Sequence, residues 1–220
     1  MTAARRRSSL VLVPRRVICI SYATGSGGDE VGRLVAERLG FLHVDEEIVA
    51  GAAARGAISA ADVADEERRK SLATRILGSI SDGGSSAMAL GGGALPVVPE
   101  HQASSNEIQA LIREAIEQTA ARGDVVITAH AAAHALKPGA NTLRVLVTAS
   151  PATRVQRVSE GAGVDIARGK RTVKAADAGR RDYLKRFYDV AEELPTHYDL
   201  VVNTDGISVE EAAALVAHVA

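Results

Sequence analysis

The chain has 220 residues, of which 46% are hydrophobic and 24% charged, so it can fill one core and is not disordered by composition. Its 26 basic and 27 acidic residues give a net charge of −1, which argues against a dedicated nucleic-acid-binding protein. A single cysteine, Cys19, excludes an internal disulfide framework and a cysteine-cluster zinc site. No apolar run approaches the roughly 20 residues that span a bilayer. We therefore expect a cytoplasmic protein with no nucleic-acid or membrane partner.

The N-terminal half opens with a strand, a glycine loop and a helix. Residues 1–14 are basic and are predicted to form a disordered tail, because their apolar stretch is too short for a secretory signal. An apolar run over 16–21 then leads into a glycine loop, and a helix with apolar periodicity ends at Gly40. A strand over 41–45 follows. We expect 51–105 to be a helical insertion with a flexible loop over 79–103, which is rich in Gly, Ser, Ala and Pro.

The C-terminal half alternates apolar runs with helical patterns. A capping box at 104–107 opens a helix, and buried strands are predicted over 124–128 and 143–147. Ser150-Pro151 begins two charged helical stretches over about 151–190. A fifth strand over 198–203 precedes a capping box at 208–211 and the last helix. This alternation predicts one domain over 15–220, a doubly wound α/β fold with a five-stranded parallel sheet and helices on both faces.

The glycine loop lies where such folds bind ligands, at the carboxyl end of the first strand. Its backbone N–H groups and the start of the next helix suit a phosphate group. A complete phosphate-binding loop also needs a lysine, and no lysine precedes Lys70. From the loop alone, a phosphate cradle and a tight turn with an acidic helix start (Asp29, Glu30) are equally good interpretations. The candidate phosphate-binding residues are Thr24, Gly25, Ser26, Gly27 and Gly28.

Basic residues gather between the fourth and fifth strands. By itself this pattern indicates a solvated helical face, since Asp177 and Arg181 have the i, i+4 spacing of an ion pair. Beside a glycine loop, the same residues favour a closing segment that stabilises a transferred phosphoryl group. We call this segment, about 161–190, the lid; its candidate bending points are Gly161, Gly163, Gly169 and Gly179. Its candidate residues are Arg168 and Lys170 for cofactor binding, and Arg171, Arg180 and Arg181 for catalysis.

Other polar residues carry weaker predictions. His130 and His134 are four residues apart but lack the glutamate of a zinc-protease motif, so a packing or substrate-pocket role is favoured and no metal site is predicted. Asp45 ends the second strand and is either a ligand-facing carboxylate or a helix N-cap. Cys19 is expected to be unreactive core.

Taken in order, several segments resemble the cytidylate kinase-like family of P-loop nucleoside monophosphate kinases. The matching segments are Ile20 to Glu30, Asp45-Glu46-Glu47-Ile48, Val125-Val126-Ile127, Asp177-x-x-Arg180-x-x-Tyr183 and Tyr198 to Thr204. The chain departs from the family at three places. Asp29 stands where an arginine is common, Ala129-His130-Ala131 replaces Gly-Arg-Gly, and Gly51 stands near the expected acceptor-binding arginine.

The resemblance implies a P-loop kinase-like fold with a helical lid, and a phosphotransferase that uses Mg·ATP. CMP or dCMP is the default acceptor, with a related small molecule as another. The glycine loop would hold the donor phosphates, the lid would supply cations, and Asp45 and His130 would bind the acceptor. The alternative is a nucleotide-binding or regulatory member that kept the fold and lost the chemistry. The sequence leaves the oligomeric state open, including a homo-oligomer.

Overall fold

The computed structural model describes residues 15–45, 105–128 and 131–220, and all structural statements below concern these ranges. The predictions for the tail (1–14), the insertion (51–105), the flexible loop (79–103), the capping box at 104–107 and His130 fall outside the described residues in whole or in part.

Five parallel strands form a single sheet in the order β2-β3-β1-β4-β5. The strands are β1 (Val17–Tyr22), β2 (Leu42–Val44), β3 (Val125–Ile127), β4 (Thr142–Thr148) and β5 (Leu200–Asn203). The central strand β1 pairs with β3 from Val17↔Val125 and with β4 from Val17↔Thr142. The predicted doubly wound α/β fold with a five-stranded parallel sheet is confirmed.

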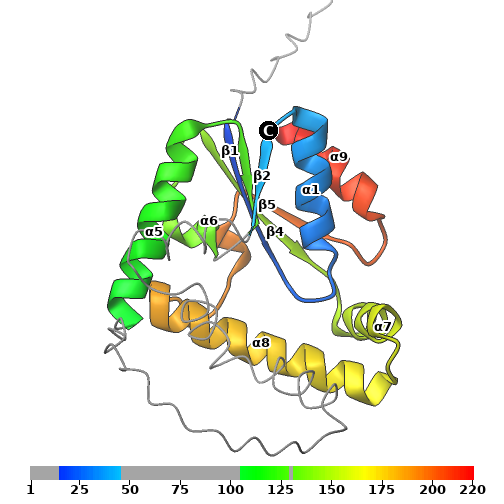
Figure 1. The fold of residues 1–220 in the computed structure, drawn as a ribbon. Helices are drawn as coiled ribbons and strands as arrows, with labels where there is room; N and C mark the ends of the chain where they lie inside the picture. The colour runs from blue at the N-terminus through cyan, green and yellow to red at the C-terminus, as the bar shows by residue number, and fades with distance from the viewer. Residues whose placement is uncertain (1–14, 46–104, 129–130) are drawn as a thin grey trace, which may run out of the picture.

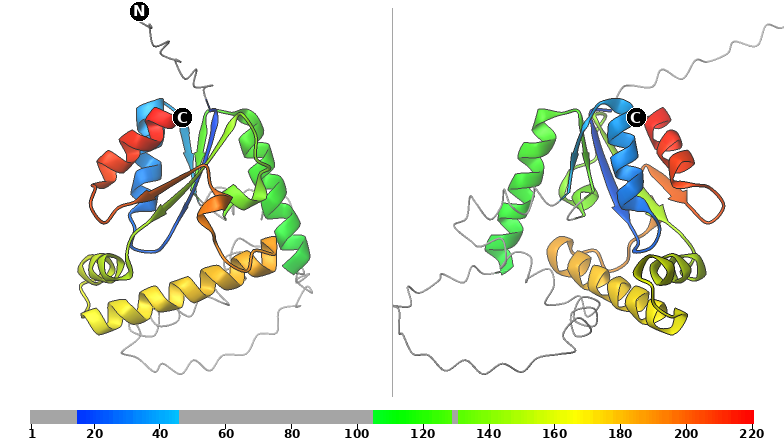
Figure 2. Two further views of the ribbon diagram at one scale, coloured as in Figure 1. Left: turned by 180° about the vertical axis from the view of Figure 1, so that it is seen from behind. Right: turned by 45° about the vertical axis from the view of Figure 1, so that its right-hand side comes forward.

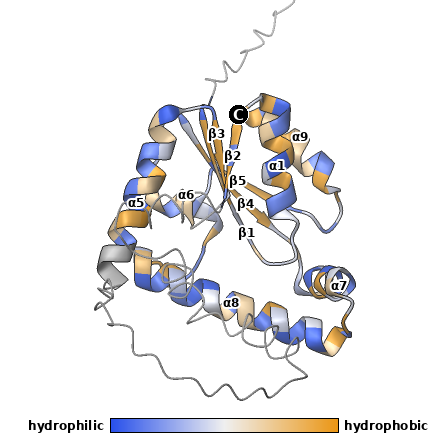
Figure 3. Ribbon diagram, viewed as in Figure 1, coloured by the Kyte–Doolittle hydropathy of each residue, from blue (hydrophilic) through white to orange (hydrophobic). Residues whose placement is uncertain are grey.

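Helices cover both faces of the sheet (Figure 1). On one face lie α1 (Gly28–Leu39) and α9 (Val209–Val219), and on the other lie α5 (Ser105–Arg122) and the short α6 (Ala132–Ala135). The strands are correspondingly hydrophobic, as Figure 3 shows. Along β1, Val17 and Cys19 belong to the core cluster under α5, while Ile18 and Ile20 belong to the cluster under α1 and α9. A strand buried on both faces has no polar side, which is why β1 appears in the sequence as a continuous apolar run.

Cys19 is fully buried, and this burial raises the pKa of its thiol to about 12. A thiol with so high a pKa carries almost no thiolate at neutral pH, so the prediction of unreactive core is confirmed.

The two predicted charged helices are α7 (Pro151–Ala162) and α8 (Ile166–Tyr188). Ser150 caps α7 as predicted, and Ser208 and Glu211 form the predicted capping box of α9. Two views show that α8 runs across the edge of the sheet at which the strands end, and that α7 lies beside its first turns (Figure 2). Gln109 of α5 donates a hydrogen bond to the carbonyl oxygen of Phe187 near the other end of α8.

Of the four candidate bending points, Gly163 lies at the turn between α7 and α8, where it ends α7 with a φ of 62°. Gly161 lies within α7, and Gly169 and Gly179 are buried within the continuous helix α8, so none of these three is at a bend. A Cβ added to Gly169 would lie 2.0 Å from Ser159 Oγ and 3.0 Å from the Val155 carbonyl oxygen of α7. At Gly169 the glycine therefore permits two helices to pack closely. The sequence also missed α6 and the 3₁₀ turn η1 (Pro195–His197), both too short for a periodic signal.

Candidate functional site

The glycine loop leaves the carboxyl end of β1 and becomes the first turn of α1. Gly25 and Gly27 have φ angles of 85° and 80°, in the left-handed region that glycine adopts without strain. Gly27 is the N-cap of α1 and provides no side-chain cap, whereas Ser150, Asp165 and Ser208 cap α7, α8 and α9. The first N–H groups of α1 are therefore available to an anion, together with the positive end of the helix dipole.

Hydrogen bonds from β4, α7 and the segment after β5 fix the shape of the loop. The buried Ser26 donates its hydroxyl to the Val147 carbonyl oxygen (3.0 Å). Thr204 donates to the Ser26 carbonyl oxygen (2.8 Å), and Arg157 in turn donates to the hydroxyl and the carbonyl oxygen of Thr204 (2.9 and 2.7 Å). These hydrogen bonds, made with residues outside the loop, fix the conformation of the loop backbone. Its N–H groups are therefore oriented before any ligand binds, so the loop is preorganised.

Arg154 joins the loop to the lid. Its Nε donates to the Thr24 carbonyl oxygen (2.7 Å), and its Nη2 forms an ion pair with Asp177 of α8 (2.5 Å). The sequence suggested that Asp177 pairs with Arg181; that interpretation was wrong, because the side chain faces α7 rather than the next turn of its own helix. Arg154 and Arg157 belong to the basic residues that gather between the fourth and fifth strands, but the sequence does not show their structural roles. Arg154 bonds to Thr24, 130 residues away, and Arg157 bonds to Thr204, 47 residues away.

Gly28 stands where a phosphate-binding loop carries its lysine, and the structure shows why a side chain is absent there. Gly28 is buried, and an added Cβ would lie 2.1 Å from Tyr22 Cβ. A side chain at this position requires the loop to move away from β1. The tyrosine at the end of β1 thus fills the space into which a loop lysine would begin.

The end of β1 also carries a concentration of charge. The pKa of Tyr22 is raised to about 12, mainly by burial and also by the charges of Asp29 and Asp45, while the charge of Arg180 opposes this rise. Asp29 is exposed in the first turn of α1, and Asp45 is half-buried directly after β2. Two carboxylates and one lid guanidinium thus act electrostatically on the same strand end.

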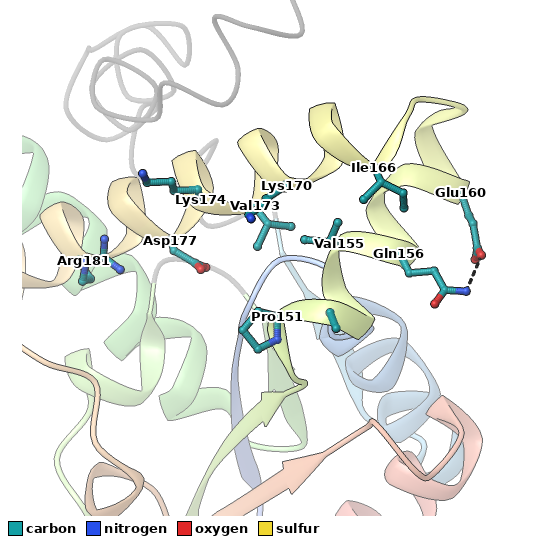
Figure 4. Close-up of a pocket in the computed structure, with 11 residues that line it drawn as sticks. Pro151, Val155, Gln156, Glu160, Ile166, Lys170, Val173, Lys174, Asp177 and Arg181 are labelled. Carbon is teal, nitrogen blue, oxygen red and sulfur yellow. Dashed lines mark hydrogen bonds between the residues drawn. The ribbon is translucent and has the colours of Figure 1, made fainter.

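The structure separates the predicted lid cations into different settings. Lys170 and Arg181 line a cavity of about 790 Å³ between α7 and α8, together with Lys174 and Asp177 (Figure 4). Val155 and Val173 give this cavity apolar walls. Arg171 is exposed on α8, and the side chain of Arg168 is half-buried near its start.

Arg180, the remaining predicted lid cation, is paired with Glu193, a residue that the sequence analysis did not single out. Its Nε and Nη2 donate to the two carboxylate oxygens of Glu193 (2.7 and 2.6 Å). Glu193 also accepts a hydrogen bond from Tyr198, whose hydroxyl lies 3.1 Å from His134 Nε2. His134 has the packing role that the sequence favoured, with its ring against those of Tyr188, His197 and Tyr198. No local pattern identifies Glu193, because its ionic partner Arg180 lies on α8 and its neighbour His134 on α6.

Within the described ranges, no group of three or more His, Cys, Asp or Glu side chains could hold a metal ion. In the same part of the chain, no helix is both long and apolar enough to cross a membrane.

A family model described as the cytidylate kinase-like family matches residues 17–206. This match covers every described strand and every described helix except α9, which begins at Val209. The chain belongs to the cytidylate kinase-like family. The predicted resemblance is therefore confirmed over nearly the full chain, including the glycine loop and the lid.

Individual relatives are more distant. A cytidylate kinase from Aeropyrum pernix is 35% identical over 97 residues, which are 44% of this chain and 56% of the relative. The chain thus matches little more than half the length of this curated relative. An uncharacterized protein from Eubacterium ventriosum has a similar structure, with a TM-score of 0.61 at 17% identity over 92% of this chain and 96% of the other. A shikimate kinase from Bacteroides thetaiotaomicron covers the same shares, with a TM-score of 0.49 at 13% identity.

Proposed function

We propose that the protein is an ATP-dependent phosphotransferase of the nucleoside monophosphate kinase type, with CMP or dCMP as acceptor. One observation carries the proposal: the uncapped first turn of α1 begins at a preorganised glycine loop on the carboxyl end of the central strand. Family membership supports kinase chemistry at this position. The cytidylate kinase relative supports a cytidine nucleotide as the acceptor, and a related small acceptor is the broader form of the proposal.

The loop fits the donor phosphates of ATP. Gly25, Gly27 and Gly28 keep the backbone free of side chains, and the N-cap of α1 provides no capping side-chain oxygen to its first N–H groups. Thr24 and Ser26 complete the binding segment. Thr24 is exposed at the loop, while the buried Ser26 hydroxyl is already used to hold the fold, so Ser26 contributes through its backbone.

The missing loop lysine is replaced, in this proposal, by cations of the lid. Arg180 acts electrostatically on the end of β1, from which the loop departs. Arg171 and Arg181 are the further catalytic candidates, and Arg168 and Lys170 the further donor-binding candidates. Guanidinium groups suit this task because they donate two parallel hydrogen bonds to phosphate oxygens and stay charged at neutral pH.

Magnesium fits only as an ion that arrives with the nucleotide. The described residues provide no preformed cluster, and Mg²⁺ commonly combines one or two carboxylates with phosphate oxygens. In this proposal Asp29, exposed in the first turn of α1, would be the carboxylate that holds it. When bound, the ion neutralises phosphate charge that Asp29 and Glu30 would otherwise repel.

Acceptor binding is assigned to Asp45 and His130. Asp45 follows β2 at the same edge of the sheet as the glycine loop. His130 lies outside the described residues, so its role in acceptor binding is proposed from the family resemblance alone.

The experiment is turnover of Arg180→Ala and Arg171→Ala in Mg·ATP with a panel of nucleoside monophosphates. Each change should lower kcat about 100-fold or more, because each removes a cation from the developing charge on the phosphoryl group. Arg38→Ala is the matched control, an exposed arginine in the last turn of α1, and should retain full activity. Unchanged rates in both lid variants would remove the lid from the mechanism.

A second candidate function is nucleotide binding without turnover. The packing of Gly28 against Tyr22 favours it, because the loop excludes the usual lysine sterically. Its signature is ATP binding by calorimetry with no diphosphate product from any acceptor.

A further inference from the structure

A small polar network fixes Arg180 beneath the sheet edge. Arg180 comes from α8, Glu193 from the segment before η1, Tyr198 from the residues before β5, and His134 from α6. The side chains of Arg180 and Glu193 are 25% and 17% exposed, and that of His134 is 8% exposed. Three separate parts of the chain thus meet around the Arg180–Glu193 pair.

The Arg180–Glu193 pair has the geometry of a strong interaction. Both carboxylate oxygens accept hydrogen bonds from one guanidinium, and the Tyr198 hydroxyl donates a further bond to one of them. Such two-point pairing fixes the plane of the guanidinium as well as its position.

Electrostatics show that Glu193 is ionised in this setting. Burial raises its pKa, but the hydrogen bonds from Arg180, His134 and Tyr198 and the charge of Arg180 outweigh burial and bring the pKa well below the usual range. The carboxylate therefore carries a full negative charge at neutral pH. Arg180 in turn is charged, and its field reaches Tyr22 at the start of the glycine loop.

We propose that Glu193 is a positioning residue that holds Arg180 in the orientation from which its guanidinium acts on the transferred phosphoryl group. Tyr198 and His134 fix Glu193 in turn. This inference rests on the proposed function, and it adds a residue that neither the glycine loop nor the lid contains. Glu193 acts through Arg180 and need not touch either substrate.

The test is a double-mutant cycle of Arg180→Ala, Glu193→Ala and the double variant, with kcat and KM for ATP and CMP. Glu193→Ala should lower kcat about 10- to 100-fold, because misplacing a catalytic group by about 1 Å has effects of this size. KM should change little. The double variant should be no slower than Arg180→Ala alone, because Glu193 has no effect once its partner is gone. Glu193→Gln, which keeps the shape and one acceptor oxygen, should recover part of the lost kcat.

Asp199→Asn is the matched control. Asp199 pairs with Arg144 through both oxygens (3.1 and 2.7 Å) at the opposite, amino-terminal edge of the sheet. The Asp199→Asn variant should have a lower thermal stability than the wild type, measured by thermal unfolding, but the same kcat. Losses that add in the double variant, or a fall in kcat for Asp199→Asn as large as that for Glu193→Ala, would overturn the positioning role. Full kcat in Glu193→Ala beside an active wild type would overturn this inference alone. An inactive wild type would overturn the proposed function and this inference with it.

Discussion

Gly28 illustrates how one residue constrains the loop. A methyl group there would lie 2.1 Å from Tyr22 Cβ, and the backbone of a central strand cannot retreat cheaply. We expect Gly28→Ala to lower the free energy of unfolding by about 2 kcal/mol or more, measured by urea denaturation. Gly161→Ala is the control, because nothing lies within 4 Å of its added Cβ and alanine favours a helix. Equal stability of both variants would show that the loop has more room than the structure indicates.

Glu193 gives the protein a characteristic pH dependence of stability. Its folded pKa lies below the ordinary value of 4.5, so its contribution is complete above that value and is lost as the pH falls toward the folded pKa. The difference in unfolding free energy between wild type and Glu193→Gln should therefore shrink by about 1 to 2 kcal/mol between pH 6 and pH 3. Urea denaturation at several pH values measures it. A difference that stays constant over this range would mean that the Arg180 pair does not form.

Single residues were predictable where their role is local. The caps Ser150, Ser208 and Gly40 act within one turn of their own helix, so the sequence shows them directly. Arg154, Arg157 and Glu193 act on distant segments, and nothing in their sequence neighbours identifies the partner. The partner of such a side chain depends on how the fold brings distant segments together, which the local sequence does not show.

Among the elements, the close contact of α7 and α8 depends on one glycine. Gly169→Ala places a methyl group 2.0 Å from Ser159 Oγ, so we expect a loss of about 1 to 3 kcal/mol in unfolding free energy. Adding Ser159→Ala removes the nearest atom and should recover part of that loss, although the Val155 carbonyl oxygen at 3.0 Å still resists. Thermal unfolding of both single variants and the double variant measures the coupling. Simply additive losses would contradict the packing of the two helices at this point.

Elements with strong periodicity or long apolar runs were predicted, and short ones were not. The strands β1 and β4 are apolar for most of their length because both faces of the sheet are covered. The four-residue helix α6 has no periodic signal, and it starts at Ala131 with a positive φ of 51° that alanine rarely adopts. The glycines of the lid suggested bends because sequence alone does not distinguish a flexible glycine from one required by helix packing.

At the scale of the whole molecule, parallel topology brings the candidate residues to one edge. The glycine loop after β1, Asp45 after β2, Ser150 after β4 and Thr204 after β5 all follow strand ends, and α8 crosses beneath them. This arrangement follows from the fold class and was predictable. The setting of each lid cation was not predictable, since that of Arg180 depends on Glu193 and the place of α8 depends on its contacts with α5 and α7.

Phosphoryl transfer by the purified wild-type protein tests the central claim most directly. The protein is incubated with Mg·ATP and each nucleoside monophosphate in turn, with an ATP-only control, and diphosphate products are separated by chromatography. We expect CDP from CMP, or dCDP from dCMP, above the ATP-only control. A folded protein that binds ATP but forms no diphosphate from any acceptor would contradict it and support the nucleotide-binding alternative.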